Sequence, residues 1–156
     1  TRFTPASYWE KADTPKRKST AQISYKSGTP TAISFQPPKE ADPKAKLSAH
    51  KGEVDPLTAL YAVLRDMPEA EACQTAFKTF DGKRSAAVSL SGKKTSGDKV
   101  TCSGEYRRLS GFSEKDMAEK TRFPFTLTYS KAEGGMLRVQ GISIETVLGK
   151  GTLTRQ

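Results

Sequence analysis

Apolar and polar residues alternate over most of this chain, which is the pattern of β-strands that bury one face. The alternation is clearest over residues 122–130, and its apolar positions are Phe123, Phe125, Leu127 and Tyr129. Shorter alternating segments lie at 21–25 and 31–35, on either side of a Ser-Gly-Thr-Pro turn. Similar patterns follow at 85–91, 100–106 and 136–148. Turn-rich segments separate them, and together they predict roughly eight or nine strands.

One segment follows a helical period instead. Its large apolar residues recur at i, i+3, i+4 and i+7, and they are Leu57, Leu60, Tyr61 and Leu64. Asp55 is a suitable N-cap, and Pro56 fits the first helical position. The segment carries no charge up to Leu64. We therefore expect a helix at about 56–66 that the rest of the protein covers on most sides.

These patterns predict a mainly β fold in one domain spanning residues 1–156. We expect a curled antiparallel sheet, either an incomplete barrel or a β-spiral, wrapped around the internal helix. Asp81 and Gly82 form a strong tight-turn signal between two strands. Residues 36–53 hold three prolines and mixed charge. They predict a flexible internal linker in which His50 is a solvated side chain.

The chain of 156 residues has a net charge of +9. The densest basic cluster is Pro-Lys-Arg-Lys-Ser at 15–19, which indicates either a contact for phosphates or lipid headgroups or a solvated hairpin end. No aromatic residue interleaves this cluster, so we expect no specific nucleic-acid partner. Peripheral contact with an anionic membrane stays open. No apolar run approaches the roughly 18 residues that a membrane span needs.

Two cysteines, Cys73 and Cys102, lie 29 residues apart and form no C-x-x-C motif. One disulfide is the economical interpretation, and it implies an oxidising compartment. Two separate buried thiols in a cytosolic protein are the alternative. A structural zinc site needs four ligands, and His50 is the only histidine, so we expect no metal.

The residue types required for catalysis are sparse. His50 lies in the expected linker, and the chain has no G-x-S-x-G motif and no P-loop. Asp55 and Asp81 have structural explanations, which leaves a carboxylate-dependent hydrolase of wall polymers as a minor alternative. The cluster of Tyr106, Arg107 and Arg108 indicates either an anion contact or a solvated strand end. We expect no enzyme and no cofactor.

The motifs "GEVDPLTALYAVLR", a cysteine, "FDGKRS" and "CSGEYRRLSGF" occur in an order that resembles the domain of unknown function 3108 family. The resemblance covers about residues 20–150. On this chain the matching positions are Asp55, Pro56, Leu57, Leu60, Leu64, Phe80, Asp81, Gly82, Cys73 and Cys102. The family consists of envelope proteins of Gram-negative bacteria, so the resemblance implies export to the periplasm. Its members carry further N-terminal strands, which implies that these strands were trimmed or are lacking here.

The chain has neither an initiator methionine nor a signal peptide, so we interpret it as mature or trimmed. We expect a periplasmic envelope protein that binds a hydrophobic ligand (lipid or lipoprotein) or a peptidic or protein partner. The expected cavity lining is Leu57, Leu60, Tyr61, Leu64, Phe123, Phe125, Leu127 and Tyr129. The competing interpretation is that these side chains only form the core. A structural module with a helix-filled interior is the alternative function.

Overall fold

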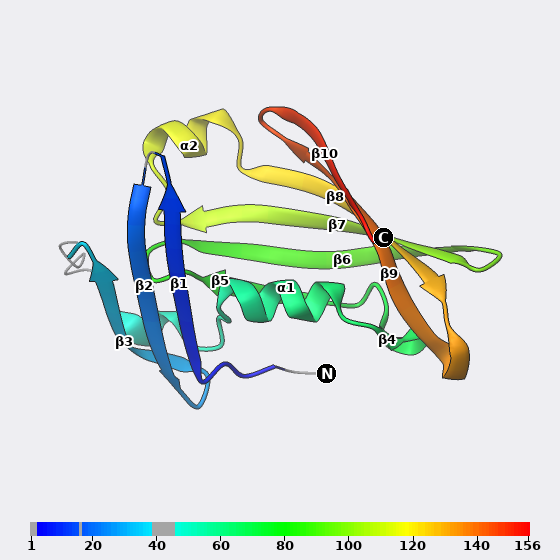
Figure 1. The fold of residues 1–156 in the computed structure, drawn as a ribbon, viewed down its shortest axis with the longest axis horizontal. Coiled ribbons are helices and arrows are strands. Elements are labelled where there is room, and N and C mark those ends of the chain that lie inside the picture. Colours follow the sequence, from blue (N-terminus) through cyan, green and yellow to red (C-terminus); the bar gives the residue numbers. More distant parts are fainter. Residues whose placement is uncertain (1–2, 16, 39–45) are drawn as a thin grey trace.

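The computed structural model describes residues 3–15, 17–38 and 46–156, and it confirms a mainly β fold. Its larger sheet is antiparallel and strongly curled into a half-barrel (Figure 1). The six strands follow the order β10-β9-β8-β7-β6-β5, and a short β4 joins at β9. Their bounds are β4 Met67–Pro68, β5 Ala76–Phe80, β6 Ser85–Ser96, β7 Lys99–Ser110, β8 Arg122–Lys131, β9 Met136–Thr146 and β10 Gly149–Thr154.

A smaller antiparallel sheet stands beside the half-barrel (Figure 1). It consists of β1 Ser7–Thr14, β2 Arg17–Lys26 and β3 Thr29–Gln36. The predicted hairpin at 21–35 is confirmed, and β1 is an edge strand. Tyr8, Ile23 and Tyr25 are buried against Phe80 of β5, so the small sheet has its own core cluster at one end of the large one. The basic cluster at 15–19 lies at the β1–β2 turn, but Lys16 is outside the described residues.

The main core lies on the concave face of the half-barrel. Strand β8 alternates as predicted, and Phe123, Phe125, Leu127 and Tyr129 are all buried. The apolar phase of β9 shifts along the strand, because the β8–β9 register changes next to Gly141. The predicted turn is also confirmed. Asp81 Oδ1 accepts hydrogen bonds from the backbone N–H groups of Lys83 and Arg84, which closes the β5–β6 hairpin.

Helix α1, Pro56–Leu64, lies within the curl. Asp55 caps it, since Oδ1 accepts from the backbone N–H groups of Leu57 and Thr58, both at 2.9 Å. The expectation that this helix is covered on most sides is wrong. Leu57 and Tyr61 are each 59% exposed and Leu60 is 53% exposed, because the half-barrel does not close over that face.

The remaining helices are short. They are the 3₁₀ turns η1 Leu47–His50, η2 Glu69–Glu71 and η3 Glu133–Gly135, and the α-helix α2 Glu114–Glu119. Within the predicted linker at 36–53, residues 39–45 lie outside the described residues, whereas η1 is folded onto the small sheet's core through Leu47. Ser113 caps α2 by accepting from the Asp116 N–H at 3.1 Å. A disulfide joins Cys73 to Cys102 on β7.

Candidate functional site

An apolar cavity of about 440 Å³ lies between α1 and the concave face of the half-barrel. Its wall comes from seven elements, β1, α1 and the strands β5 to β9, which the curl of the sheet brings together. The apolar lining is Ala59, Leu60, Val63, Leu64, Ala86, Val88, Phe125, Ile142 and Ile144. The volume falls within the ~300–1,000 Å³ range of small-molecule sites. The helix therefore narrows the interior of the half-barrel without filling it.

The structure distributes the eight predicted lining residues over three environments. Leu60, Leu64 and Phe125 line the cavity. Phe123, Leu127 and Tyr129 are buried, and none of them is part of the cavity wall. Leu57 and Tyr61 project from the open face of α1, because the helix buries a different face, formed by Ala59, Ala62 and Val63. The concave face of the sheet is therefore closely packed around Phe123, Leu127 and Tyr129, and it lines a cavity around Phe125.

Several lining residues were not predicted. Ala86 and Val88 lie on β6, and Ile142 and Ile144 lie on β9. The alternation in both strands is visible in the sequence. What the sequence lacks is the strand order, in which β6 and β9 are separated by β7 and β8. Only the curl of the sheet turns their inward faces toward one helix.

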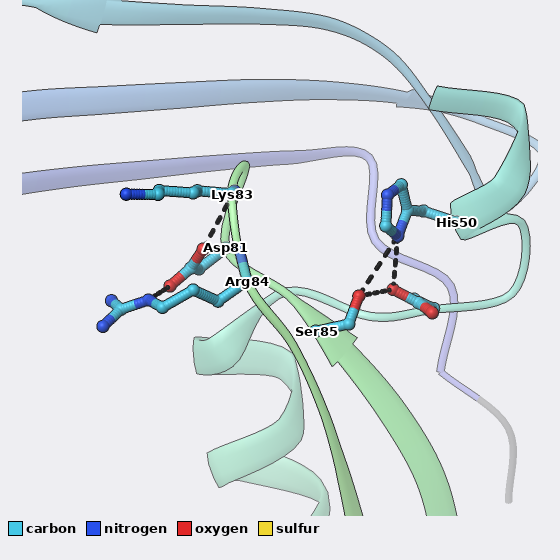
Figure 2. A network of polar contacts seen from close by, with 6 residues as sticks. His50, Asp81, Lys83, Arg84 and Ser85 are labelled. Carbon is cyan, nitrogen blue, oxygen red and sulfur yellow. Dashed lines mark hydrogen bonds and ion pairs between the residues drawn. The ribbon is translucent and has the colours of Figure 1, made fainter. Parts of the chain in front are cut away.

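One end of the cavity is polar. Asp81 and Arg84 lie there with Phe112 and Glu10. Arg84 Nε donates to Asp81 Oδ2 at 2.7 Å (Figure 2). The Arg84 guanidinium carbon lies 5.6 Å from the Phe112 ring centre. Burial raises the pKa of the Tyr106 phenol on the cavity wall, so this hydroxyl stays neutral at physiological pH. The cavity thus offers an apolar body with one polar end.

The cluster of Tyr106, Arg107 and Arg108 is divided among different roles. Tyr106 lines the cavity. Arg108 Nη1 donates to the backbone carbonyls of Asp116 and Lys120, which stabilises the C-terminal turn of α2. Its guanidinium carbon also lies 4.9 Å from the Phe123 ring centre. Arg108 is therefore occupied by the fold, which accounts for it without an anion ligand.

A polar network that the sequence did not predict joins η1 to the start of β6 (Figure 2). His50 Nδ1 lies 2.8 Å from Glu53 Oε2 and 3.2 Å from Ser85 Oγ. The Ser85 hydroxyl donates to the same Glu53 oxygen at 2.7 Å. The expectation of a solvated His50 is wrong, because its ring stacks on Phe80 with centres 3.8 Å apart and its side chain is 16% exposed.

This network contains the residue types of a serine hydrolase in a different geometry. In a catalytic triad the serine and the acid contact opposite nitrogens of the imidazole. Here both Ser85 and Glu53 contact Nδ1, and Ser85 is 3% exposed. The arrangement fits a structural tie between η1 and β6. Asp55 is likewise buried in its cap, and Asp81 is held in its turn.

The disulfide indicates an oxidising, extracytoplasmic compartment. No helix among the described residues is long and apolar enough to span a bilayer. The chain matches no protein-family model, no curated protein and no solved structure.

Proposed function

We propose that this protein is a non-enzymatic periplasmic protein that binds a hydrophobic ligand, a lipid or the acyl chain of a lipoprotein, in the cavity beside α1. The observation that carries the proposal is the apolar cavity of about 440 Å³ between α1 and the half-barrel. A water-filled cavity with such walls is unfavourable, because each Å² of apolar surface left in water costs roughly 25 cal/mol. An apolar ligand would remove that cost.

Three further observations support this proposal. Leu60 lies on the cavity wall and is half-exposed, so the cavity has an apolar entrance. The disulfide supports an extracytoplasmic site of action. The resemblance in motif order to periplasmic envelope proteins is consistent with both, and membership of that family remains part of the proposal.

The alternative functions receive less support. A structural module with a helix-filled interior requires a solid core, and the cavity favours ligand binding over it. A hydrolase of wall polymers requires paired carboxylates directed at a substrate. Of the two aspartates considered, Asp55 is 2% exposed in its cap and Asp81 Oδ2 is engaged by Arg84.

Filling the cavity should weaken ligand binding. Ile144 lies on the cavity wall, so Ile144→Trp places an indole in the space a ligand would use. We expect the affinity for a dansyl-labelled fatty acid, measured by fluorescence titration, to fall by about tenfold or more. The control is Thr126→Trp, at an exposed position of the neighbouring β8, which should bind like the wild type.

A second variant tests the same cavity in case Ile144→Trp does not fold. A Cβ on Gly104 would lie 2.2 Å from Phe125 Cε2, so Gly104→Ala forces the Phe125 ring off β7, toward the cavity that it lines. It should also weaken binding of the probe. Unchanged affinity in both folded variants would contradict the proposal, because the probe would then bind elsewhere.

A further inference from the structure

A second cavity, of about 460 Å³, lies on the other side of α1. Thr58, Ala62 and Arg65 line it from one stripe of the helix, and Ala76 and Phe77 line it from β5. Gly52, Val54 and Phe3 border it as well. None of these residues lines the apolar cavity, so α1 separates two independent spaces.

The β5 side of this second cavity is an incompletely paired sheet edge. Val54 N–H donates to the Lys78 carbonyl, and Phe80 N–H donates to the Val54 carbonyl, both at 2.9 Å. The backbone groups of Lys78 and Phe80 therefore point away from β6. Because successive residues of a strand point their backbone groups to alternate sides, Ala76 directs its N–H and C=O away from β6 as well. The Leu90 N–H donates to the Thr75 carbonyl at 2.7 Å. The backbone groups of Thr75 and of every second residue after it therefore point toward β6.

The pairing with Val54 stops before it reaches Ala76. Gly52 would continue the ladder, but its N–H donates to the Gly28 carbonyl at 2.8 Å, which directs the chain away from β5. Within the described part of the chain, no hydrogen bond occupies the outward N–H and C=O of Ala76 or the N–H of Lys78. These groups form a short template for strand addition.

A cationic group stands at the same end of the cavity. From Thr58 to Arg65 the helix rises roughly 10 Å, which equals the length of about three residues of a strand. Since α1 begins beside Thr79, which is bridged to Val54, Arg65 lies level with Ala76. The Arg65 side chain is 16% exposed. Its Nη2 donates to Glu71 at 2.5 Å and its Nη1 to the Asp66 carbonyl at 3.2 Å.

The Arg65 guanidinium retains an unused donor. Its Nε–H is buried and has no hydrogen-bond partner among the described residues. A buried donor of this kind is uncommon in folded proteins. The Phe3 ring centre lies 5.5 Å from the guanidinium carbon, so Phe3 would move aside for an anion to reach this edge of the group. A carboxylate is the oxygen acceptor that matches a guanidinium best.

We propose that the second cavity binds the C-terminal end of an extended peptide, which adds to the edge of β5 with its terminal carboxylate on Arg65. The end of the peptide runs antiparallel to β5, since Arg65 lies level with the first residue of that strand, and the preceding residues leave the edge before Lys78, whose carbonyl already accepts from Val54. Its penultimate residue lies opposite Ala76 and exchanges two hydrogen bonds with it. Strand addition and carboxylate capture are two established modes of peptide recognition, and here one groove holds the groups for both.

The first test changes only the peptide. A pool of acetylated pentapeptides, randomised at every position, is passed over the immobilised protein as the free acid and as the C-terminal amide. We expect the free acids to be retained about tenfold more strongly, because the amide lacks the charge that Arg65 recognises. Equal retention of the two pools, or retention of neither, would overturn the proposal.

The second test changes the sheet edge. Ala76→Pro removes the outward N–H and keeps the rest of the site, and proline is tolerated on an edge strand. We expect it to weaken retention of the free-acid pool by about tenfold. Thr152→Pro, on the free edge of β10, is the matched control and should bind like the wild type. A folded Ala76→Pro variant with unchanged retention would also overturn the proposal. Ile144→Trp should retain the peptides fully, which separates this site from the apolar cavity.

Discussion

The double variant Cys73→Ala/Cys102→Ala should lose about 3.5 kcal/mol of unfolding free energy, the chain-entropy value for a cross-link of this length. The bond joins residues 29 positions apart, and both cysteines are buried in the main core. It ties the segment after η2 to the central strand β7, with the whole β5–β6 hairpin inside the loop. Urea unfolding monitored by circular dichroism would measure the change.

The backbone at Cys73 provides a matched control. Cys73 adopts a left-handed conformation with φ of 61°, which costs a side-chain-bearing residue roughly 1–2 kcal/mol. The variant Cys73→Gly/Cys102→Ala lacks the same cross-link but relieves this strain. It should be more stable than the double-alanine variant by about 1 kcal/mol. If the double-alanine variant unfolds at the wild-type urea concentration, the disulfide contributes no stability and this account of the loop is wrong.

Gly111→Ala should destabilise the protein by about 3 kcal/mol, because two penalties coincide at one residue. Gly111 has φ of +76°, a conformation that strains alanine. A Cβ there would also lie 2.0 Å from the Lys83 carbonyl oxygen, which belongs to the turn between β5 and β6. Both partners in this contact are backbone atoms, so no flexible side chain can move aside to relieve the clash.

Gly97→Ala separates the two penalties, because it carries the backbone penalty without the steric clash. Gly97 has φ of +57°, and a Cβ there would meet no atom within 4 Å. Its cost should be about 1 kcal/mol, from the backbone conformation alone. Thermal unfolding of both variants measures the difference. Equal melting temperatures for the two would contradict the close approach of residues 83 and 111, which also positions Arg84 and Phe112 at the polar end of the cavity.

Local signals in the sequence predict the elements of this fold well. The cap at Asp55, the turn at Asp81 and the alternation of β8 each depend on residues close together in the chain. The disulfide and the curled sheet were also predicted, the first with free thiols as an alternative. The cap, the turn and the alternation are predictable because short-range chemistry determines them.

The site was predictable only in part, because it depends on contacts between distant segments. Leu60, Leu64 and Phe125 were found from periodicity, whereas Ile142 and Ile144 join them only through the strand order. His50 was misjudged because its partners, Phe80 and Ser85, lie more than two dozen residues away. The exposure of Leu57 and Tyr61 follows from a half-barrel that stays open, which no local pattern specifies.

The central claim is that the cavity beside α1 holds a hydrophobic ligand. Native mass spectrometry of protein exported to an oxidising bacterial periplasm tests it most directly. The account predicts that wild-type protein carries an apolar adduct, released and identified as a lipid on unfolding, and that Ile144→Trp carries little or none. Wild-type protein with only the mass of the bare chain, or an adduct that persists equally in the folded Ile144→Trp variant, would contradict it.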